Sequence, residues 1–227
     1  MAYKRGDSAN IIVGAAAIFI ADQDTPLPQP SGTKSYAETL SEAPNASVTV
    51  SDGLWRNVGY TSNGLELQFA PEFGEVQVDQ LLDVAKMYKS GMTVTLNTSF
   101  AEATLDNLAV AIAQSYAKNN AAIADADDVT PTGNWTGKVL DLTSGKLGEC
   151  PMERKLVAVG PGGGDCDPVA PAERIYTAFR VLSIDSVTAS AKRDEASIFD
   201  VSFRLFPNGN GLYGQIVDRT YSPPPSS

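Results

Sequence analysis

The sequence predicts a mainly β protein, built as an antiparallel β-sandwich or barrel with one flanking α-helix. Apolar and polar residues alternate along several short segments, which is typical of strands with one buried and one solvated face. Clusters of Gly, Pro, Asn and Asp separate these segments and indicate turns. One segment in the middle of the chain shows helical spacing instead. The 227 residues suffice for one large β domain with its own core, so we expect a single domain over residues 1–227.

The N-terminal quarter predicts strands, an irregular arm and a hairpin turn. Residues 11–20 (IIVGAAAIFI) are the most apolar run and predict a buried first strand, since the run is too short to span a bilayer. Residues 22–46 contain four prolines, which remove ladder donors, and we expect an irregular N-terminal arm there. Alternation over residues 47–51, continued by residues 54–58, predicts another strand. The Asn63-Gly64 pair between apolar runs is a strong signal for a hairpin turn.

The middle of the chain predicts two alternating strands, a long loop between them and then the helix. The strands are expected at Leu65–Phe69 and Met92–Leu96. Residues 70–91 separate them and are expected to form the long loop, although Val76 and Val78 alternate with Glu75, Gln77 and Asp79, a pattern that marks a strand. The helix is expected over Thr104–Lys118, with its first residue as the N-cap. Its apolar stripe should dock it on the sheet through Leu105, Leu108 and Ile112.

The C-terminal half predicts a loop-rich insertion followed by the closing strands. Residues 119–171 are rich in Ala, Asp, Thr and Gly and form the expected insertion, with a short strand at Leu156–Val159. Residues 207–211 predict a turn, and residues 222–227 a flexible C-terminal tail. Three further strands are expected at Arg174–Asp185, Val187–Ala191 and Ile198–Phe206. Alternation in the last of them should place four side chains in the core: Phe199, Val201, Phe203 and Leu205.

The composition argues against catalysis. The chain has no histidine, which removes the commonest general base, the commonest metal ligand and every nucleophile that histidine activates. Many Asp and Glu pairs could in principle serve a glycosidase, but no pair is singled out by the sequence. No catalytic residue is therefore assigned.

No segment predicts a cofactor or a metal. Cys150 and Cys166 are too few for a zinc site or a disulfide framework; reduced thiols are favoured, and a bond between the two stays open. Gly160–Gly164 lacks the Lys-Ser/Thr pair of a phosphate-binding loop. Two acidic clusters lack the spacing of a calcium loop and are expected to be solvated, at Asp125, Asp127 and Asp128 and at Asp165 and Asp167.

The charge balance argues against tight binding of nucleic acid. The net charge is −10, the pI is about 4.4, and no segment clusters Lys and Arg. Affinity for nucleic acid comes mainly from neutralising phosphates, so an acidic chain would repel DNA.

Three regions, in their order along the chain, carry a family resemblance. A turn opens a strand with Gly59, Thr61 and Gly64, and a second motif opens the helix with Glu102, Thr104, Leu105, Asn107 and Leu108. Residues 55–117, which contain both motifs, resemble the major tail (tail tube) proteins of siphophages, the long-tailed, non-contractile bacteriophages. Residues 174–206 are similar to the closing strands of that family, and the opening residues 9–22 are similar to its first strand.

The resemblance implies a structural subunit, not an enzyme, that self-assembles into homo-hexameric rings stacked helically into a tail tube. Edge strands of neighbouring subunits would join into a continuous inner β-barrel, and rings would stack through the long loop at residues 70–91 and the terminal arms. The implied partners are the tape measure protein and the tail terminator and tip proteins. The implied location is the virion, after assembly in the host cytoplasm.

The resemblance also gives the acidity a meaning. DNA would pass through the lumen during ejection without specific binding, and no membrane contact is expected. A hexamer of chains at −10 each would carry −60 per ring, which suits a lumen that repels DNA. We expect the polar face of the sheet to supply these carboxylates.

Two other readings compete with the tail tube. One is another phage or cell-surface β module, such as a decoration, tail-tip or adhesin domain, which would bind a preformed protein partner and would not polymerise. The other is a histidine-free hydrolase that uses Asp and Glu, which predicts a concave pocket with two close carboxylates.

Overall fold

The computed structural model describes residues 11–42, 55–79, 83–115, 118–122, 136–144, 146–163, 169–190, 193–194 and 196–224. Within these ranges the chain forms two short helices, α1 (Tyr36–Glu42) and α2 (Leu105–Ala111). The strands are β1 (Ala17–Asp22), β2 (Arg56–Asn57), β3 (Thr61–Gln77), β4 (Val84–Phe100), β5 (Lys118–Ala122), β6 (Thr136–Val139), β7 (Arg154–Pro161), β8 (Ala172–Ser183), β9 (Phe199–Leu205) and β10 (Gly214–Thr220). The prediction of a mainly β fold is confirmed.

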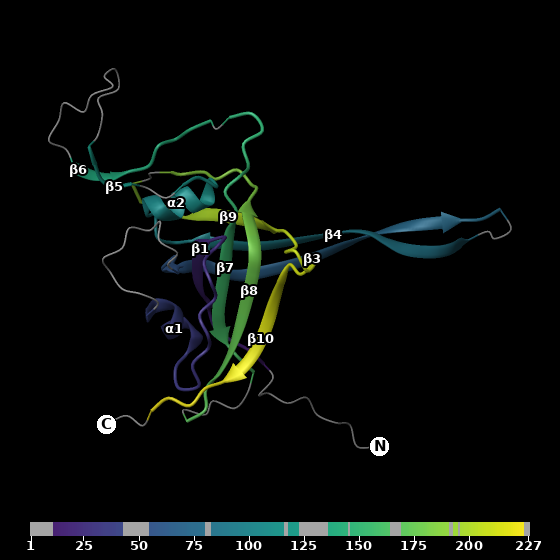
Figure 1. The fold of residues 1–227 in the computed structure, drawn as a ribbon, viewed down its shortest axis with the longest axis horizontal. Helices are drawn as coiled ribbons and strands as arrows, with labels where there is room; N and C mark the ends of the chain where they lie inside the picture. Colours follow the sequence, from purple (N-terminus) through teal and green to yellow (C-terminus); the bar gives the residue numbers. More distant parts are fainter. Residues whose placement is uncertain are drawn as a thin grey trace.

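Eight of the strands form one antiparallel sheet. Its order is β2-β1-β7-β8-β9-β4-β3, and β10 also pairs with β8. One edge of β8 is shared, because Ala172–Ala178 pair with β10 and Val181–Ser183 pair with β9. The sheet turns at this point, so that β9, β4 and β3 run across β1, β7 and β8 (Figure 1). The described sheet is open, with β2 and β3 as its ends, and its two crossing parts are consistent with a sandwich.

The main core lies between the two crossing parts of the sheet. It unites side chains from β1, β4, β7, β8 and β9 with residues of α2. The four predicted core residues of β9 are all buried there, at 1–5% exposure, so that prediction is confirmed. The fully or almost fully buried residues of the main core include Ile18, Ile20, Val94, Leu96, Phe100, Leu156 and Phe203.

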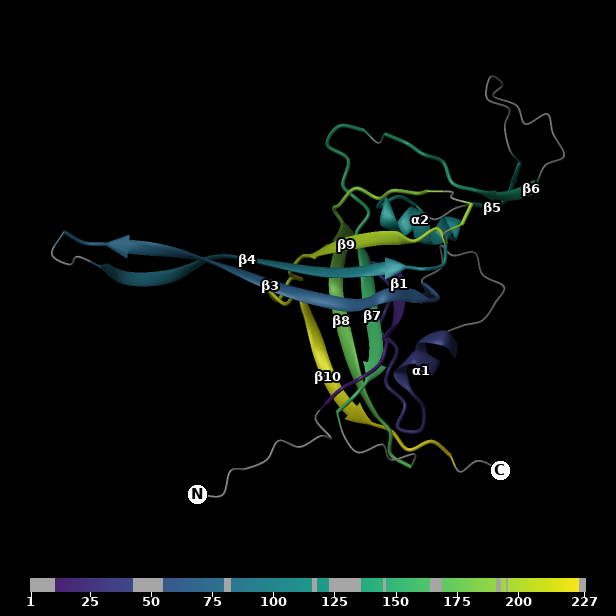
Figure 2. The same cartoon turned by 180° about the vertical axis from the view of Figure 1, so that it is seen from behind.

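A second core covers the opposite face of β1, β7 and β8. Phe19 and Val157 alternate with the main-core residues and point to this second face, where α1 packs through Tyr36 and Leu40. Strands β1 and β7 are therefore buried on both faces, which explains why their central residues, AIFIA and LVAV, are continuous apolar runs rather than alternating ones. Both views place α1 beside these strands, on the side away from β3 and β4 (Figures 1 and 2).

Strands β3 and β4 continue far beyond the body as a two-stranded arm. Ala70–Gln77 pair with residues 84–93 in an antiparallel ladder, with irregularities at Glu72/Phe73 and Val76/Gln77. The ribbon projects away from all other elements in both views (Figures 1 and 2). The expectation of a loop over residues 70–91 is therefore wrong, apart from residues 80–82, which lie outside the described residues. We call residues 70–79 and 83–93 the hairpin arm.

The N-terminal expectations need two corrections. The first strand begins at Ala17 rather than Ile11, and Ile11 and Val13 are 71% and 83% exposed. The segment expected to be an irregular arm contains α1, because Tyr36 and Leu40 lie one helical turn apart and can pack together on the second core. The strand expected at residues 47–51 lies outside the described residues, and its continuation is reduced to β2.

Helix α2 is shorter than predicted, and one residue of its predicted docking face is exposed. It ends at Ala111, because Ala113 adopts a φ of +54° that leaves the helical conformation. Thr104 is the N-cap, as predicted. Leu108 is partly buried and packs against the main core, as predicted. Leu105 is exposed and Ile112 is only partly buried, so the docking prediction is wrong for Leu105. The residues that α2 buries are Asp106, Asn107, Ala109, Val110 and Ala111.

The C-terminal half differs from expectation in three places. The supposed insertion at 119–171 contains β7, which lies between β1 and β8 in the sheet; its other strands, β5 and β6, form a separate two-stranded sheet. No strand forms at residues 187–190 of the segment predicted as Val187–Ala191. Strand β10 was not predicted, because Gly214–Thr220 shows no clear alternation of apolar and polar residues. The turn at 207–211 is confirmed, with Gly211 at a φ of +77°.

Candidate functional site

Four residues of the two sequence motifs meet where the chain enters α2: Gly59, Glu102, Thr104 and Asn107. Asn107 is fully buried, and its side-chain amide donates to the carbonyl oxygens of Val58 and Glu102, both at 2.8 Å. Its side-chain oxygen accepts from the Arg56 guanidinium at 2.6 Å, and the Thr104 hydroxyl accepts from the Asn107 backbone N–H at 3.2 Å. One asparagine thus joins the β2–β3 connection to the start of α2. We call Asn107 and its four hydrogen-bonding partners, Arg56, Val58, Glu102 and Thr104, the asparagine lock.

Gly59 completes the connection from the other side. The Glu102 carboxylate accepts from the Tyr60 backbone N–H at 2.9 Å and occupies the space next to Gly59. A Cβ at Gly59 would lie 2.1 Å from the Glu102 Cδ, and the φ of Gly59 is +84°. Only glycine fits both requirements. Gly59 and Glu102 therefore hold together the start of β3, the strand that leads into the hairpin arm.

The Asn63-Gly64 pair forms a bulge inside β3, not the predicted hairpin turn. Both residues have positive φ, 63° and 71°. Ser62 pairs with Ser99 and Leu65 pairs with Thr98, so Asn63 and Gly64 are extra residues in the ladder. The Thr98 hydroxyl donates to the Gly64 carbonyl at 2.9 Å. The positive φ angles that an Asn-Gly pair favours are therefore present. The chain does not reverse here, because β3 continues to Gln77 before β4 begins.

The hairpin arm exposes large apolar side chains. Phe73 and Met87 are each 57% exposed, and Tyr88 is 52% exposed. The alternation that buries Leu65 and Leu67 in part continues outward through Phe69, which is 52% exposed. An apolar stripe therefore begins in the core and runs out along one face of the arm. Large exposed apolar surfaces of this kind indicate a protein contact.

An apolar groove lies at the base of the arm. It has a cavity volume of about 430 Å³ and lies between β3 and β4 on one side and β8 and β10 on the other. Leu67 and Phe69 contribute from the arm side, and Tyr176, Leu212 and Ile216 contribute from the body. Ile216 and Leu212 are 52% and 45% exposed. The groove and the stripe on the arm form one continuous apolar surface.

A polar cleft of about 590 Å³ lies over β4 and β9. Three carboxylates line it, from Glu66, Asp185 and Asp200, together with amide and hydroxyl groups. The Ser99 hydroxyl donates to Asp200 at 2.6 Å, and the Ser202 hydroxyl donates to the Asn97 side chain at 2.8 Å. This is the acidic, polar face of the sheet that the sequence led us to expect.

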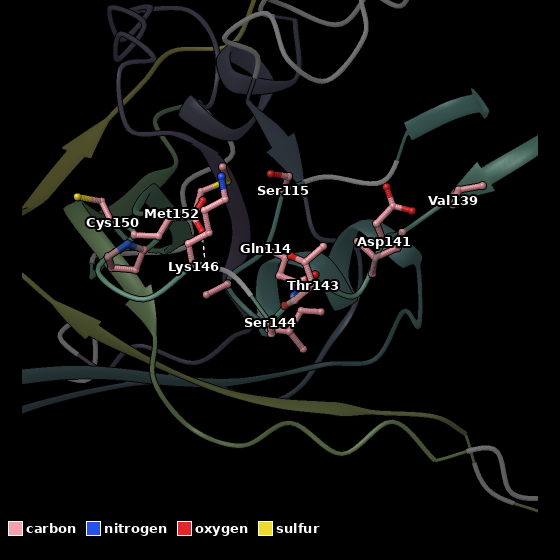
Figure 3. Close-up of a pocket in the computed structure, with 14 residues that line it drawn as sticks. Gln114, Ser115, Val139, Asp141, Thr143, Ser144, Lys146, Cys150 and Met152 are labelled. Atoms are coloured by element: carbon pink, nitrogen blue, oxygen red, sulfur yellow. Dashed lines mark hydrogen bonds between the residues drawn. The ribbon is translucent and has the colours of Figure 1, made fainter. Parts of the chain in front are cut away.

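A third cavity, of about 470 Å³, lies beside the end of α2 (Figure 3). Gln114 donates to the Thr143 carbonyl at 2.8 Å. The opposite wall comes from residues 139–141, 143–144, 146 and 149–152. Cys150 lines this cavity and is exposed. Cys166 lies outside the described residues, so reduced thiols at these two positions stay a prediction, and a bond between them stays open. The two acidic clusters and Gly164 also lie outside. No group of three metal-ligating side chains converges within the described ranges.

A buried ion pair ties the N-terminal region to the C-terminal strand. Glu173 on β8 is 4% exposed and accepts from the Arg219 guanidinium on β10 at 2.6 Å. The same carboxylate accepts from the Ser35 hydroxyl and the Tyr36 backbone N–H at the start of α1. Burial raises the pKa of the Tyr36 hydroxyl, and the nearby Arg219 opposes that rise. These contacts stabilise the second core.

A second cluster of charged side chains, Asp22, Arg154 and Lys155, lies at the end of β1. Arg154 is 2% exposed, and its guanidinium lies 3.6 Å from the Asp22 carboxylate. Partial burial raises the pKa of Asp22, and Arg154 opposes that rise. Burial lowers the pKa of Lys155, which donates to the Thr25 carbonyl at 2.6 Å. These groups fix the turn after β1.

Comparisons with known proteins identify no relative. No protein-family model matches the chain, and no curated protein matches it significantly. No helix among the described residues is long and apolar enough to cross a membrane. The function must therefore be argued from the fold, the asparagine lock and the exposed surfaces.

Proposed function

We propose that this protein is a structural subunit of the tail tube of a long-tailed, non-contractile bacteriophage. It is not an enzyme in this proposal; copies of the chain assemble into hexameric rings, and the rings stack into the conduit for DNA ejection. The observation that carries the proposal is the hairpin arm, a long β-ribbon with exposed apolar side chains on a well-packed body. A surface of this kind on a β protein favours assembly with other chains.

The asparagine lock supports the same proposal. The motif residues that carry the family resemblance lie far apart in the sequence, yet Gly59 and Glu102 are in contact and Asn107 bonds to both sides of the junction. They hold the strand from which the arm extends. In a subunit that assembles through its arm, the direction of that strand determines how copies meet.

The polar cleft is the proposed lumen surface. Its carboxylates, Glu66, Asp185 and Asp200, would repel DNA phosphates and leave a film of water and ions between protein and DNA. The net charge of −10 extends this effect around a ring. Weak interaction is what a conduit requires, because DNA must leave quickly.

The proposed partners and location follow from the same role. Copies of the chain would assemble in the host cytoplasm, enclose a tape measure protein, and end at terminator and tip proteins in the virion. Residues 70–91 would contribute to contacts between copies. No cofactor, metal or membrane takes part in this proposal.

Negative-stain electron microscopy of the purified chain at high concentration, with a mass measurement beside it, tests the proposal. Tubes or hexameric rings are the expected result. Monodisperse monomers at every concentration would overturn it and would favour a β module that binds a preformed partner, such as a decoration, tail-tip or adhesin domain.

The lumen assignment has its own test in an assembled tail. Replacing Glu66, Asp185 and Asp200 by their amides should slow DNA ejection or change its salt dependence, because fewer lumen charges would repel the phosphates. Unchanged ejection kinetics would remove the polar cleft from the lumen.

A further inference from the structure

The hairpin arm has two free edges along its whole length. Among the described strands β3 pairs only with β4, and residues 84–94 of β4 pair only with β3. Each edge therefore presents backbone N–H and C=O groups that no other described strand uses. Such edges are templates for another strand, and a two-stranded ribbon without further support is only marginally stable.

The two edges carry opposite charges. In the paired part of the arm, β3 contains Glu72 and Glu75 and no basic residue, whereas β4 from Val84 to Gly91 contains Lys86 and Lys89 and no acidic residue. Two further carboxylates, Asp79 and Asp83, lie beyond the paired residues at the tip of the arm. The four charged side chains of the paired part are exposed. None of them forms an ion pair with any described residue. The arm thus has one acidic edge and one basic edge, both unsatisfied.

The charges also match on each face of the ribbon. Directly opposed residues of an antiparallel pair share a face, and so do residues two apart on one strand. Lys89 lies opposite Phe73, and Glu75 lies two residues beyond Phe73 on β3. Glu75 and Lys89 are therefore on the same face. Glu72 and Lys86 lie on the other face, together with Tyr88, whose ring lies against Gly74. The β4 edge of one arm beside the β3 edge of another would therefore bring opposite charges together on both faces.

From these observations we infer that the hairpin arms of successive copies pair side by side, β4 of one copy with β3 of the next, into a shared antiparallel sheet. The inference rests on the proposed self-assembly and names its partner surface. When two arms point the same way, β4 of the first and β3 of the second run antiparallel, as β3 and β4 already do within one arm. The contact joins two different edges, so it is head-to-tail and can close into a ring.

Charge complementarity selects a second copy as the occupant of each edge. A partner with a wholly acidic or wholly basic strand would match one edge of the arm and be repelled by the other. Within the paired part of the arm, this chain supplies both complements in equal number, two carboxylates and two ammonium groups. The exposed Phe73, Met87 and Tyr88 add apolar contact area to the same junction.

Charge reversal on one edge tests the inference. The variant K86E/K89E makes both edges acidic, and E72K/E75K makes both basic, so neither should assemble with itself. We expect the concentration needed for assembly to rise at least about tenfold in each, since attractive pairs become repulsive ones. An equimolar mixture of the two variants, and the fourfold exchange E72K/E75K/K86E/K89E, should assemble as the wild-type chain does.

A matched control separates the arm from net charge. K146E/R193E changes the charge of the chain by the same amount at two exposed positions away from the arm, and it should assemble like the wild-type chain. Circular dichroism and the thermal midpoint establish that every variant folds. The assembled fraction is measured by sedimentation and negative stain.

The outcomes are distinguishable. If folded K86E/K89E and E72K/E75K assemble as well as the wild-type chain, or if the mixture and the fourfold exchange both fail, edge pairing of the arms is overturned while self-assembly stands. If the wild-type chain itself never assembles, the proposed function is overturned and the edge pairing with it.

Discussion

The central strands β1, β7 and β8 and the hairpin arm are built from the same antiparallel ladder but lie in opposite surroundings. Ile18 and Phe19 on β1 point to opposite faces of the sheet, and both are almost completely buried, at 0% and 1% exposure. On the arm, Phe73 and Tyr88 are 57% and 52% exposed. Backbone pairing alone therefore does not bury a strand; covering of its faces does.

This difference separates folding from assembly. Burial of a side chain such as Phe19 contributes about 1.5–3 kcal/mol to the stability of the body, and both faces of the central strands gain from it. The arm gains almost nothing of this kind within one chain. Its conformation depends on its own ladder and, in our proposal, on the next copy.

Truncating an aromatic residue in each region should give the largest contrast. Phe203→Ala removes a 1%-exposed side chain whose ring lies 6.4 Å from that of Phe100, and we expect a loss of about 3–5 kcal/mol in the free energy of unfolding. Phe73→Ala on the arm should change it by no more than about 0.5 kcal/mol in dilute, unassembled protein. Urea unfolding followed by circular dichroism measures both. Similar losses for the two variants would mean that the arm contributes to the fold of the single chain.

Removing the asparagine of the lock should have the next largest effect. Asn107→Ala leaves the carbonyl groups of Val58 and Glu102 without their donor in a buried site, and we expect a loss of about 2–4 kcal/mol. Asn97→Ala is the matched control, because its half-buried side chain accepts one hydrogen bond from Ser202. The same unfolding experiment applies. Equal effects at the two positions would show that the lock is not a special junction.

Two glycines with similar backbone angles should respond differently. Gly59→Ala forces the Glu102 carboxylate away from the Tyr60 N–H in addition to the cost of a positive φ, and we expect a loss of about 2 kcal/mol. Gly64→Ala, with a φ of +71° and no atom within 4 Å of the added carbon, should lose about 1 kcal/mol. Thermal unfolding at fixed pH compares them. The reverse order would contradict the proposed contact between Gly59 and Glu102.

The smallest effect should be a change in pH dependence at the end of β1. Burial raises the pKa of Asp22 above its ordinary value of 3.8, so the folded chain holds this proton more tightly than the unfolded chain. The stabilisation is present below the unfolded pKa and is lost as pH rises through the folded pKa. Asp22→Asn should therefore gain stability relative to wild type as pH rises from about 4 to 7. Glu72→Gln, which removes one exposed carboxylate on the arm, is the matched control. The thermal midpoint of each variant is measured against that of the wild-type chain at each pH. A constant difference between Asp22→Asn and wild type at every pH would contradict the prediction.

Local patterns were predictable where burial is one-sided. The alternation of β9 predicted Phe199, Val201, Phe203 and Leu205 in the core, and all four are there, because a sheet with one buried face leaves a period of two in the sequence. The N-cap at Thr104 was predictable for a similar reason, since its side chain caps a nearby backbone N–H.

The same reasoning failed where distant residues decide. Helical spacing predicted that Leu105 would dock α2, yet Leu105 is exposed and the polar Asn107 is buried, because Asn107 satisfies carbonyl groups that other segments bring to it. The arm differs from the predicted loop for another reason. Its sequence alternates only briefly, around Val76, and the long ladder is set by pairing with β4 rather than by burial of one face.

Composition and periodicity alone therefore predict the β class, the one-sided strands and the start of α2. Contacts between distant segments show that residues 70–77 and 84–93 extend a hairpin, that α1 covers a second core, that β10 joins β8, and that Glu102 meets Gly59. The two kinds of information differ in range. Side-chain periodicity reports the burial of a segment against its immediate surroundings, whereas strand pairing and buried hydrogen bonds depend on which distant segments the fold brings together.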